Sequence, residues 1–182
     1  MQQAQHIPEP VFLLFPALLS LAKNQMATKI TIYTDGSARG NPGPGGYGIV
    51  LMSGSHRKEL SEGYRKTTNN RMELLAVIVA LEKLKHDHCE VDIYTDSKYV
   101  ADAVEKGWVF AWEKKQFKKK KNPDLWIRFL KIYRKHNVTF HWVKGHANNK
   151  ENERCDKLAV EASYNPNLKI DEAYENDDNR LL

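Results

Sequence analysis

The stretch TIYTDGS at residues 31–37 has a near-copy, DIYTDSK, at residues 92–98. Each copy ends a run of strand-forming residues with an aspartate, Asp35 in the first copy and Asp96 in the second. Side chains alternate between the two faces of a strand, so each aspartate shares a face with the tyrosine two residues before it. If the two strands are parallel neighbours about 4.8 Å apart, the two carboxylates lie side by side at the carboxyl edge of a sheet.

Two neighbouring carboxylates repel each other, so one of them is partly protonated unless a cation lies between them. A hard divalent cation with oxygen ligands fits this need, and Mg²⁺ is the usual choice. Either aspartate alone is better explained as a turn or helix-cap residue, because Asp-Gly-Ser and Asp-Ser are good turn sequences. The pair therefore becomes specific only in combination with further acidic residues.

The rest of the pattern predicts one α/β domain with a mixed sheet covered by helices. Strands are predicted at 29–34, 47–52, 58–66, 90–95 and 138–143, and helices at 69–86, 97–107, 123–136 and 151–164. The first three strands are predicted to form an antiparallel meander, and the strand at 90–95 follows a helix and should run parallel to the first. We expect the glycine-rich stretch 39–48 to be a loop, and Asn69 or Asn70 to cap the long helix.

The charge is unevenly distributed along the 182 residues. The net charge is +5, but residues 1–26 are neutral and residues 171–182 carry −4, which leaves +9 on residues 27–170. A basic body favours a polyanionic partner. We therefore expect three parts: an N-terminal extension (1–26), a basic domain (27–165) and an acidic, flexible C-terminal tail (166–182).

The apolar stretch at 11–22 is too short to span a membrane, for which about 20 residues are needed. It lacks the cationic segment of a secretion signal, and Met26 directly precedes the first predicted strand, so an upstream extension is the favoured interpretation. The two cysteines have no metal-type spacing and favour a reducing compartment, which predicts a cytoplasmic protein.

Further candidate residues lie in two other blocks, TTNNRMEL (67–74) and VKGHANNKENERCD (143–156). The first contains Glu73, which alone would be ordinary compensation of a helix dipole. The second contains His146 on a predicted loop and Asp156 on a predicted helix. Alone, these two residues would be a solvated histidine and a surface acid.

Taken together, these blocks resemble the ribonuclease H family, type 1 (bacterial ribonuclease HI-like), over about residues 28–165. The resemblance is carried by YTDGSARGNPGPGGYG, TTNNRMEL, YTDSKYV, DLW and WVKGHANNKENERCDKLA, in that order. It implies a ribonuclease H-like α/β fold, in which a five-stranded mixed sheet, three strands antiparallel and then two parallel, is flanked by helices. It also implies an endoribonuclease that hydrolyses the RNA strand of an RNA–DNA hybrid and leaves 5′-phosphate and 3′-hydroxyl ends.

By this resemblance, four carboxylates hold two divalent metal ions, Mg²⁺ with Mn²⁺ as a substitute. The metal-binding residues are Asp35, Glu73, Asp96 and Asp156, and His146 assists proton transfer or product release. The chemistry of the residues agrees, because four carboxylates in one site require cations and two ions can clamp a phosphoryl displacement. A histidine near neutral pKa on a loop suits proton traffic.

The resemblance also assigns the contacts to the hybrid. Asn41, Asn69 and Asn70 match positions that read the RNA 2′-hydroxyl, although turn chemistry and helix capping explain them equally simply. Lys66 and Thr68 match a pocket for a DNA phosphate, in which the family often has an asparagine where this chain has Ala111. The pocket is therefore expected to lack one polar contact.

Six lysines lie between residues 114 and 121, beside Trp108. The segment resembles the basic protrusion of bacterial members, so Trp108 and the lysines are candidate hybrid-binding residues; the four consecutive lysines are Lys118, Lys119, Lys120 and Lys121. The alternative is a solvated loop of mutually repelling charges.

Two other functions remain open from the sequence, an integrase-like or resolvase-like DNA nuclease of the same fold and a non-catalytic hybrid-binding module. The 2′-hydroxyl readers argue against the first, and the presence of all four carboxylates argues against the second. No heptad pattern is visible, so we expect a monomer.

Overall fold

The computed structural model describes residues 29–145, 147 and 149–179. The predicted N-terminal extension and His146 therefore lie outside the described residues. The strands are β1 (Ile30–Ala38), β2 (Gly43–Ser53), β3 (His56–Thr67), β4 (Glu90–Thr95) and β5 (Asn137–Trp142). The helices are α1 (Asn69–Glu82), α2 (Lys98–Glu105), α3 (Trp108–Lys114), α4 (Pro123–Tyr133), α5 (Lys150–Ser163) and α6 (Glu172–Asn179).

The strands form one mixed sheet in the order β3-β2-β1-β4-β5. β1 pairs antiparallel with β2 and β2 with β3, whereas β1–β4 and β4–β5 are parallel. The predicted fold class and the predicted parallel pairing of the two IYTD copies are both confirmed. Tyr33 lies directly opposite Tyr94, and their rings stack with centroids 4.8 Å apart.

The glycine-rich stretch 39–48 is only partly the loop that the sequence predicted, because residues 43–48 belong to β2 and only 39–42 connect β1 to it. β1 continues past Asp35 to Ala38, and β2 begins at Gly43. The glycines allow α5 to cross the sheet closely: a Cβ at Gly48 would lie 2.1 Å from the carbonyl oxygen of Cys155. Close packing of α5, rather than a turn, explains Gly46 and Gly48, whereas a Cβ at Gly43 or Gly45 would meet the backbone of Arg39 or Ser37.

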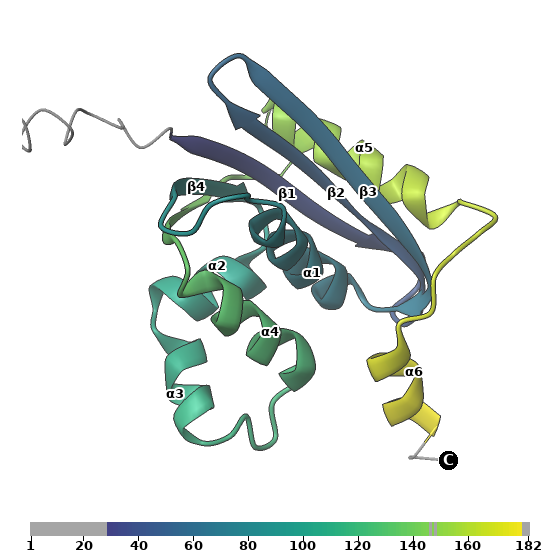
Figure 1. Cartoon of the computed structure of the whole chain (residues 1–182). Coiled ribbons are helices and arrows are strands. Elements are labelled where there is room, and N and C mark those ends of the chain that lie inside the picture. Colours follow the sequence, from purple (N-terminus) through teal and green to yellow (C-terminus); the bar gives the residue numbers. More distant parts are fainter. Residues whose placement is uncertain (1–28, 146, 148, 180–182) are drawn as a thin grey trace, which may run out of the picture.

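Helices cover both faces of the sheet (Figure 1), with α1 on one face and α5 on the other. α1 is itself covered by α4, so it is buried on more than one side. Met72, Leu75 and Ala76 are buried, and so are Leu74 and Ile78. The main core lies in this layer, between the sheet, α1 and the cluster of α2, α3 and α4.

The helix starts are capped in different ways. Ser97 caps α2, since its Oγ accepts a hydrogen bond from the backbone N–H of Val100 at 3.3 Å. The predicted caps of α1 are wrong, because Asn69 and Asn70 are its first two residues. The Oδ1 atom of Asn41 instead accepts from the backbone N–H of Asn69 at 3.2 Å. A cap from a distant loop cannot be recognised from local sequence.

The C-terminal segment, predicted as an acidic flexible tail, makes contacts with the domain. Lys169 pairs with Tyr64 beside β3, and Asp171 is buried. The segment is acidic, but buried and surface arginines hold its carboxylates, so the charge that suggested a loose tail is what attaches it to the domain. Figure 1 shows α6 below the C-terminal end of β3, at the opposite end from the turn that joins β2 to β3. Within the described ranges, no helix is long and apolar enough to cross a bilayer.

Candidate active site

The two aspartates of the repeated stretch meet at the end of the parallel β1–β4 ladder. Thr34 of β1 pairs with Thr95 of β4, and Asp35 and Asp96 are the next residues after this pair. Asp35 is only 9% exposed, and its Oδ1 accepts a hydrogen bond from the Gly36 backbone N–H at 2.7 Å. One backbone donor solvates a buried carboxylate poorly, so its surroundings must supply further positive charge or a proton.

Glu73 reaches the same edge because α1 packs directly on β1. A Cβ at Gly36 would lie 2.1 Å from the backbone nitrogen of Glu73, so only glycine permits this approach. The carboxylate of Glu73 accepts hydrogen bonds from Ser97 Oγ at 2.5 Å and from Asn69 Nδ2 at 2.8 Å. These two donors hold Glu73 between the start of α1 and the start of α2.

α5 supplies the remaining polar groups of the cluster. Asp156 lies on α5, and its charge helps to raise the pKa of Asp35. One turn earlier, the Asn152 amide donates to Asp96 Oδ2 at 3.3 Å. Asn152 is only 2% exposed, and within the described part of the chain its own oxygen has no hydrogen-bond partner. Sequence reasoning missed Asn152, although its position four residues before Asp156 on a helix was a usable signal.

The electrostatics of the cluster reflect crowding of acids in a buried place. Burial, followed by the charge of Asp96, raises the pKa of Asp35 to about 8. Burial also raises the pKa of Glu73 to about 7, although hydrogen bonds from Ser97 and Asn69 oppose that rise. Groups with such shifts mark candidate functional sites.

The residues of the cluster fit a divalent metal in chemistry, but the side chains do not form a finished ligand shell. Among the described residues, no group of three or more His, Cys, Asp or Glu side chains is arranged to hold a metal ion. Hard cations prefer oxygen ligands, and the cluster offers four carboxylates and the amide oxygen of Asn152. That buried oxygen can accept from water or bind a cation, which supports the fit.

A hollow of about 530 Å³ lies near the start of α1. It is lined by three of the predicted substrate residues, Asn41, Thr68 and Asn70, and by two of the predicted lysines, Lys120 and Lys121. Asn69 does not line it but connects it to the acidic cluster, since Asn69 contacts both Asn41 and Glu73. Amides, a hydroxyl and cations around one hollow suit a phosphate backbone.

Two features of this hollow differ from the predicted phosphate pocket. Lys66 is not among the described residues that line it. Ala111 had suggested that one polar contact would be missing, but Asn122, immediately after the lysines, adds a third amide to those of Asn41 and Asn70. Asn122, which the sequence analysis did not single out, adopts a left-handed conformation at the start of α4.

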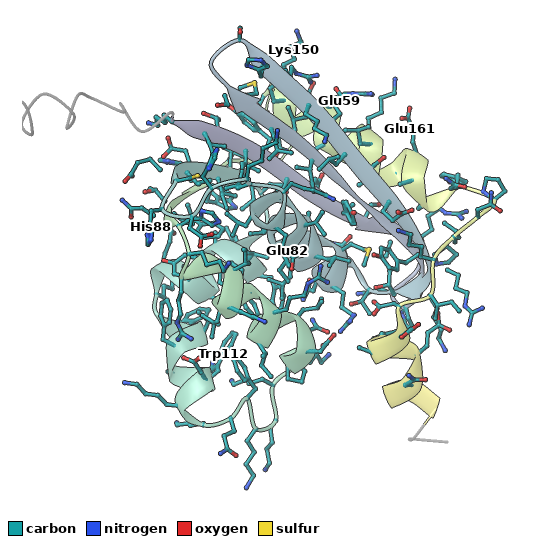
Figure 2. All side chains as sticks on the ribbon, in the orientation of Figure 1. Glu59, Glu82, His88, Trp112, Lys150 and Glu161 are labelled. Atoms are coloured by element: carbon teal, nitrogen blue, oxygen red, sulfur yellow. The ribbon has the colours of Figure 1, made fainter. Side chains whose placement is uncertain are left out.

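The tryptophans divide between surface and core. Trp108 is 45% exposed on α3, with the Lys106 Nζ 4.9 Å from its ring, so it is accessible to a ligand. Figure 2 labels Trp112 in the helical layer, where it packs edge-on against the fully buried Trp126. Lys118 and Lys119 are exposed but do not line the hollow.

Comparison with known proteins agrees with this geometry. The family model described as RNase H matches residues 27–164. A ribonuclease H from Desulforamulus reducens is 57% identical over 154 residues, which cover 82% of this chain and 96% of the relative. A ribonuclease HI from Synechocystis is 53% identical over 152 residues, covering 80% of this chain and 94% of the relative.

Solved structures give the same assignment. LC9-RNase H1, a type 1 enzyme, superposes with a TM-score of 0.68 at 31% identity, covering 75% of this chain and 72% of that chain. LC11-RNase H1 in complex with an RNA/DNA hybrid superposes with a TM-score of 0.54 at 31% identity, covering 80% of this chain and 99% of that chain. The acidic cluster, the fold and these similarities agree, and this chain belongs to the ribonuclease H family, type 1.

Proposed function

We propose that this ribonuclease H is a metal-dependent endonuclease that cleaves the RNA strand of RNA–DNA hybrids and leaves 5′-phosphate and 3′-hydroxyl ends. The observation that supports this most directly is the convergence of four carboxylates, from β1, α1, the end of β4 and α5, at one edge of the sheet. A buried aspartate whose pKa is raised to about 8, by burial and then by its acidic neighbours, is typical of a functional site.

Asp35, Glu73, Asp96 and Asp156 would hold two divalent ions, Mg²⁺ in the cell with Mn²⁺ as a substitute. When bound, such ions neutralise the carboxylates, make water a better nucleophile and stabilise the leaving oxygen. Ser97 and Asn69 orient Glu73, and Asn152 orients Asp96, before any ligand arrives. His146, which lies outside the described residues, would move a proton or assist product release.

The hybrid would lie across the acidic cluster and the hollow. Asn41, Asn69 and Asn70 would read the RNA strand, where the 2′-hydroxyl distinguishes RNA from DNA; the hydrogen bond between Asn41 and Asn69 supports a joint role. Thr68 and Asn122 would contact the DNA backbone, and Trp108 and the lysines at 118–121 would extend the basic surface. Lys66, two residues before Thr68 in the sequence, would make a secondary contact with the DNA backbone.

We also infer a cytoplasmic monomer. The support is indirect: both cysteines are free thiols, and the sequence has no heptad pattern of a coiled-coil partner. Sedimentation of the purified protein at several concentrations would test the oligomeric state.

One gel assay tests the proposal. The enzyme is incubated with an RNA–DNA hybrid, duplex DNA and single-stranded RNA, each with Mg²⁺, with Mn²⁺ or with EDTA. We expect cleavage of only the RNA strand of the hybrid, and none in EDTA. Equal cleavage of duplex DNA would indicate an integrase-like nuclease, and absence of cleavage with either metal would indicate a binding module.

A further inference from the structure

The C-terminal segment is fixed to the domain beyond residue 164, where the match to the family model ends. The backbone N–H of Arg65 donates to the Lys169 carbonyl at 2.9 Å, and the backbone N–H of Lys169 donates to the Gly63 carbonyl at 2.8 Å. Farther along, the carboxylate of Glu175 accepts from the Arg65 guanidinium at 2.9 Å. These bonds extend the β3 edge and direct the chain toward the start of α1.

At that point Arg71 joins three segments of the chain. Its side chain is only 3% exposed, and its guanidinium donates two hydrogen bonds of 2.7 Å to Asp171 in the C-terminal segment. It donates two more, of 2.9 and 2.8 Å, to Asp124 at the start of α4. Asp171 also accepts from the Thr67 hydroxyl at 2.8 Å. A buried guanidinium paired on both sides is a rigid connection.

The three segments that Arg71 joins are also the walls of the hollow. The start of α1 contributes Thr68 and Asn70, the loop before α4 contributes residues 120–122, and the C-terminal segment contributes Tyr174. The ring centroid of Tyr174 lies 5.6 Å from the guanidinium carbon of Arg71. The distance between the start of α1 and the loop before α4 therefore depends on Arg71. Tyr174 lines the hollow only because the C-terminal segment is attached to the domain.

The charges indicate how the hollow attracts a ligand. Arg71 and its two carboxylate partners sum to −1, so Arg71 offers a phosphate no net attraction. The positive charge comes from Lys120 and Lys121. Arg71 and Asp171 thus fix the positions of the walls, whereas the two lysines attract the phosphate.

We propose that the C-terminal segment is a working part of the nucleic-acid site. Asp171 is a positioning residue that, through Arg71, holds the wall at 68–70 at a fixed distance from the wall at 120–122. Tyr174 is a binding residue whose ring packs against the sugar next to a backbone phosphate in the hollow. This inference rests on the proposed function, since it concerns how the hybrid is bound.

The test compares Asp171→Asn and Tyr174→Ala with the matched control Glu172→Gln. Glu172 belongs to the same segment, is exposed and does not line the hollow. Steady-state kinetics on a hybrid are measured well below the unfolding midpoint of each variant. We expect KM to rise about tenfold in the first two variants, equivalent to about 1.4 kcal/mol of binding free energy, while kcat changes less than KM. Tyr174→Phe, which keeps the ring, should recover most of the affinity.

A second readout separates positioning from plain stability. Hybrids with a single neutral methylphosphonate are scanned along the DNA strand. In the wild-type enzyme one position should lower kcat/KM, and that penalty should disappear in Asp171→Asn because the phosphate is no longer held. Reduced stability alone would lower the active fraction without changing the position dependence.

The outcomes are distinct. An unchanged KM in both folded variants would show that the segment is only structural. A lower KM in Asp171→Asn would overturn the positioning role and show that the acidic charge screens the hollow against phosphate. If wild-type enzyme fails to cleave the unmodified hybrid, the proposed function itself is wrong.

Discussion

Neutralising Asp35 should stabilise the metal-free protein at alkaline pH. The pKa of Asp35 is raised from 3.8 to about 8, chiefly by burial and then by Asp96. The folded state therefore holds a proton that the unfolded chain releases, and this stabilising contribution is lost as pH rises from about 4 to about 8. Asp35→Asn removes the cost of ionising the group and keeps an acceptor for the Gly36 N–H.

The magnitude follows from the shift. Each pKa unit corresponds to about 1.4 kcal/mol, so a shift of about four units sets an upper limit of about 5 kcal/mol at pH 8. The repulsion is distributed over the four acids, so removing one charge should yield about half of this limit. We expect Asp35→Asn to raise the free energy of unfolding by about 2–3 kcal/mol at pH 8 and by less than about 1 kcal/mol at pH 5. Added Mg²⁺ should stabilise the wild type more than the variant, which narrows the difference.

The assay is urea denaturation in EDTA, followed by tryptophan fluorescence at pH 5, 6.5 and 8. The control is Asp92→Asn, because Asp92 lies on the same face of the sheet but its pKa is lowered, first by a hydrogen bond from Lys29 and then by His141. Its stabilising effect is present above about pH 4 and lost as pH falls further, so Asp92→Asn should destabilise the protein from pH 5 to pH 8. Our interpretation is refuted if Asp35→Asn is less stable than the wild type at pH 8, or if its effect is the same at pH 5 and pH 8.

Three further predictions concern packing, metal affinity and binding. Gly36→Ala should lower the free energy of unfolding by about 2 kcal/mol or more and remove most of the activity, since its Cβ would overlap the α1 backbone. Gly54→Asn is the control, because Gly54 lies in open space at φ +57°, and it should cost less than about 1 kcal/mol. Equal urea midpoints for the two variants would contradict this. Asn152→Ala should raise the Mg²⁺ concentration for half-maximal cleavage about tenfold, because Asp96 would have no amide donor at that position, and an unchanged metal titration would exclude that role. Replacing Lys118 and Lys119 by alanine should make the dependence of the hybrid-binding constant on salt less steep, by about 0.9 in the slope of log K against log salt for each phosphate that the variant no longer neutralises. Fluorescence anisotropy would measure this slope, with Lys131→Ala as the control. An identical slope would indicate that the lysines form only a solvated loop.

The local sequence was sufficient for the five predicted strands, for α1, α2, α4 and α5 and for two of the acids, but it did not predict α3 or α6. Alternation in the two IYTD copies predicted two strands, and the helix between them predicted their parallel pairing, because periodicity and chain handedness act over short stretches. The same alternation predicted that Asp35 and Asp96 lie together. The family resemblance then added Glu73 and Asp156, which no local pattern would have assigned to that edge.

Only the tertiary structure decided the burial, the pKa values and the interaction partners of these residues. The pKa of Asp35 depends on α1 and α5 covering it, and Gly46 and Gly48 are needed because α5 crosses the sheet over them. Asn122, at the start of α4, adds an amide to the hollow, and Asp171 attaches the acidic C-terminal segment through Arg71. Burial and ion pairing arise between segments distant in sequence, so composition predicts which charges are present but not which of them find a partner.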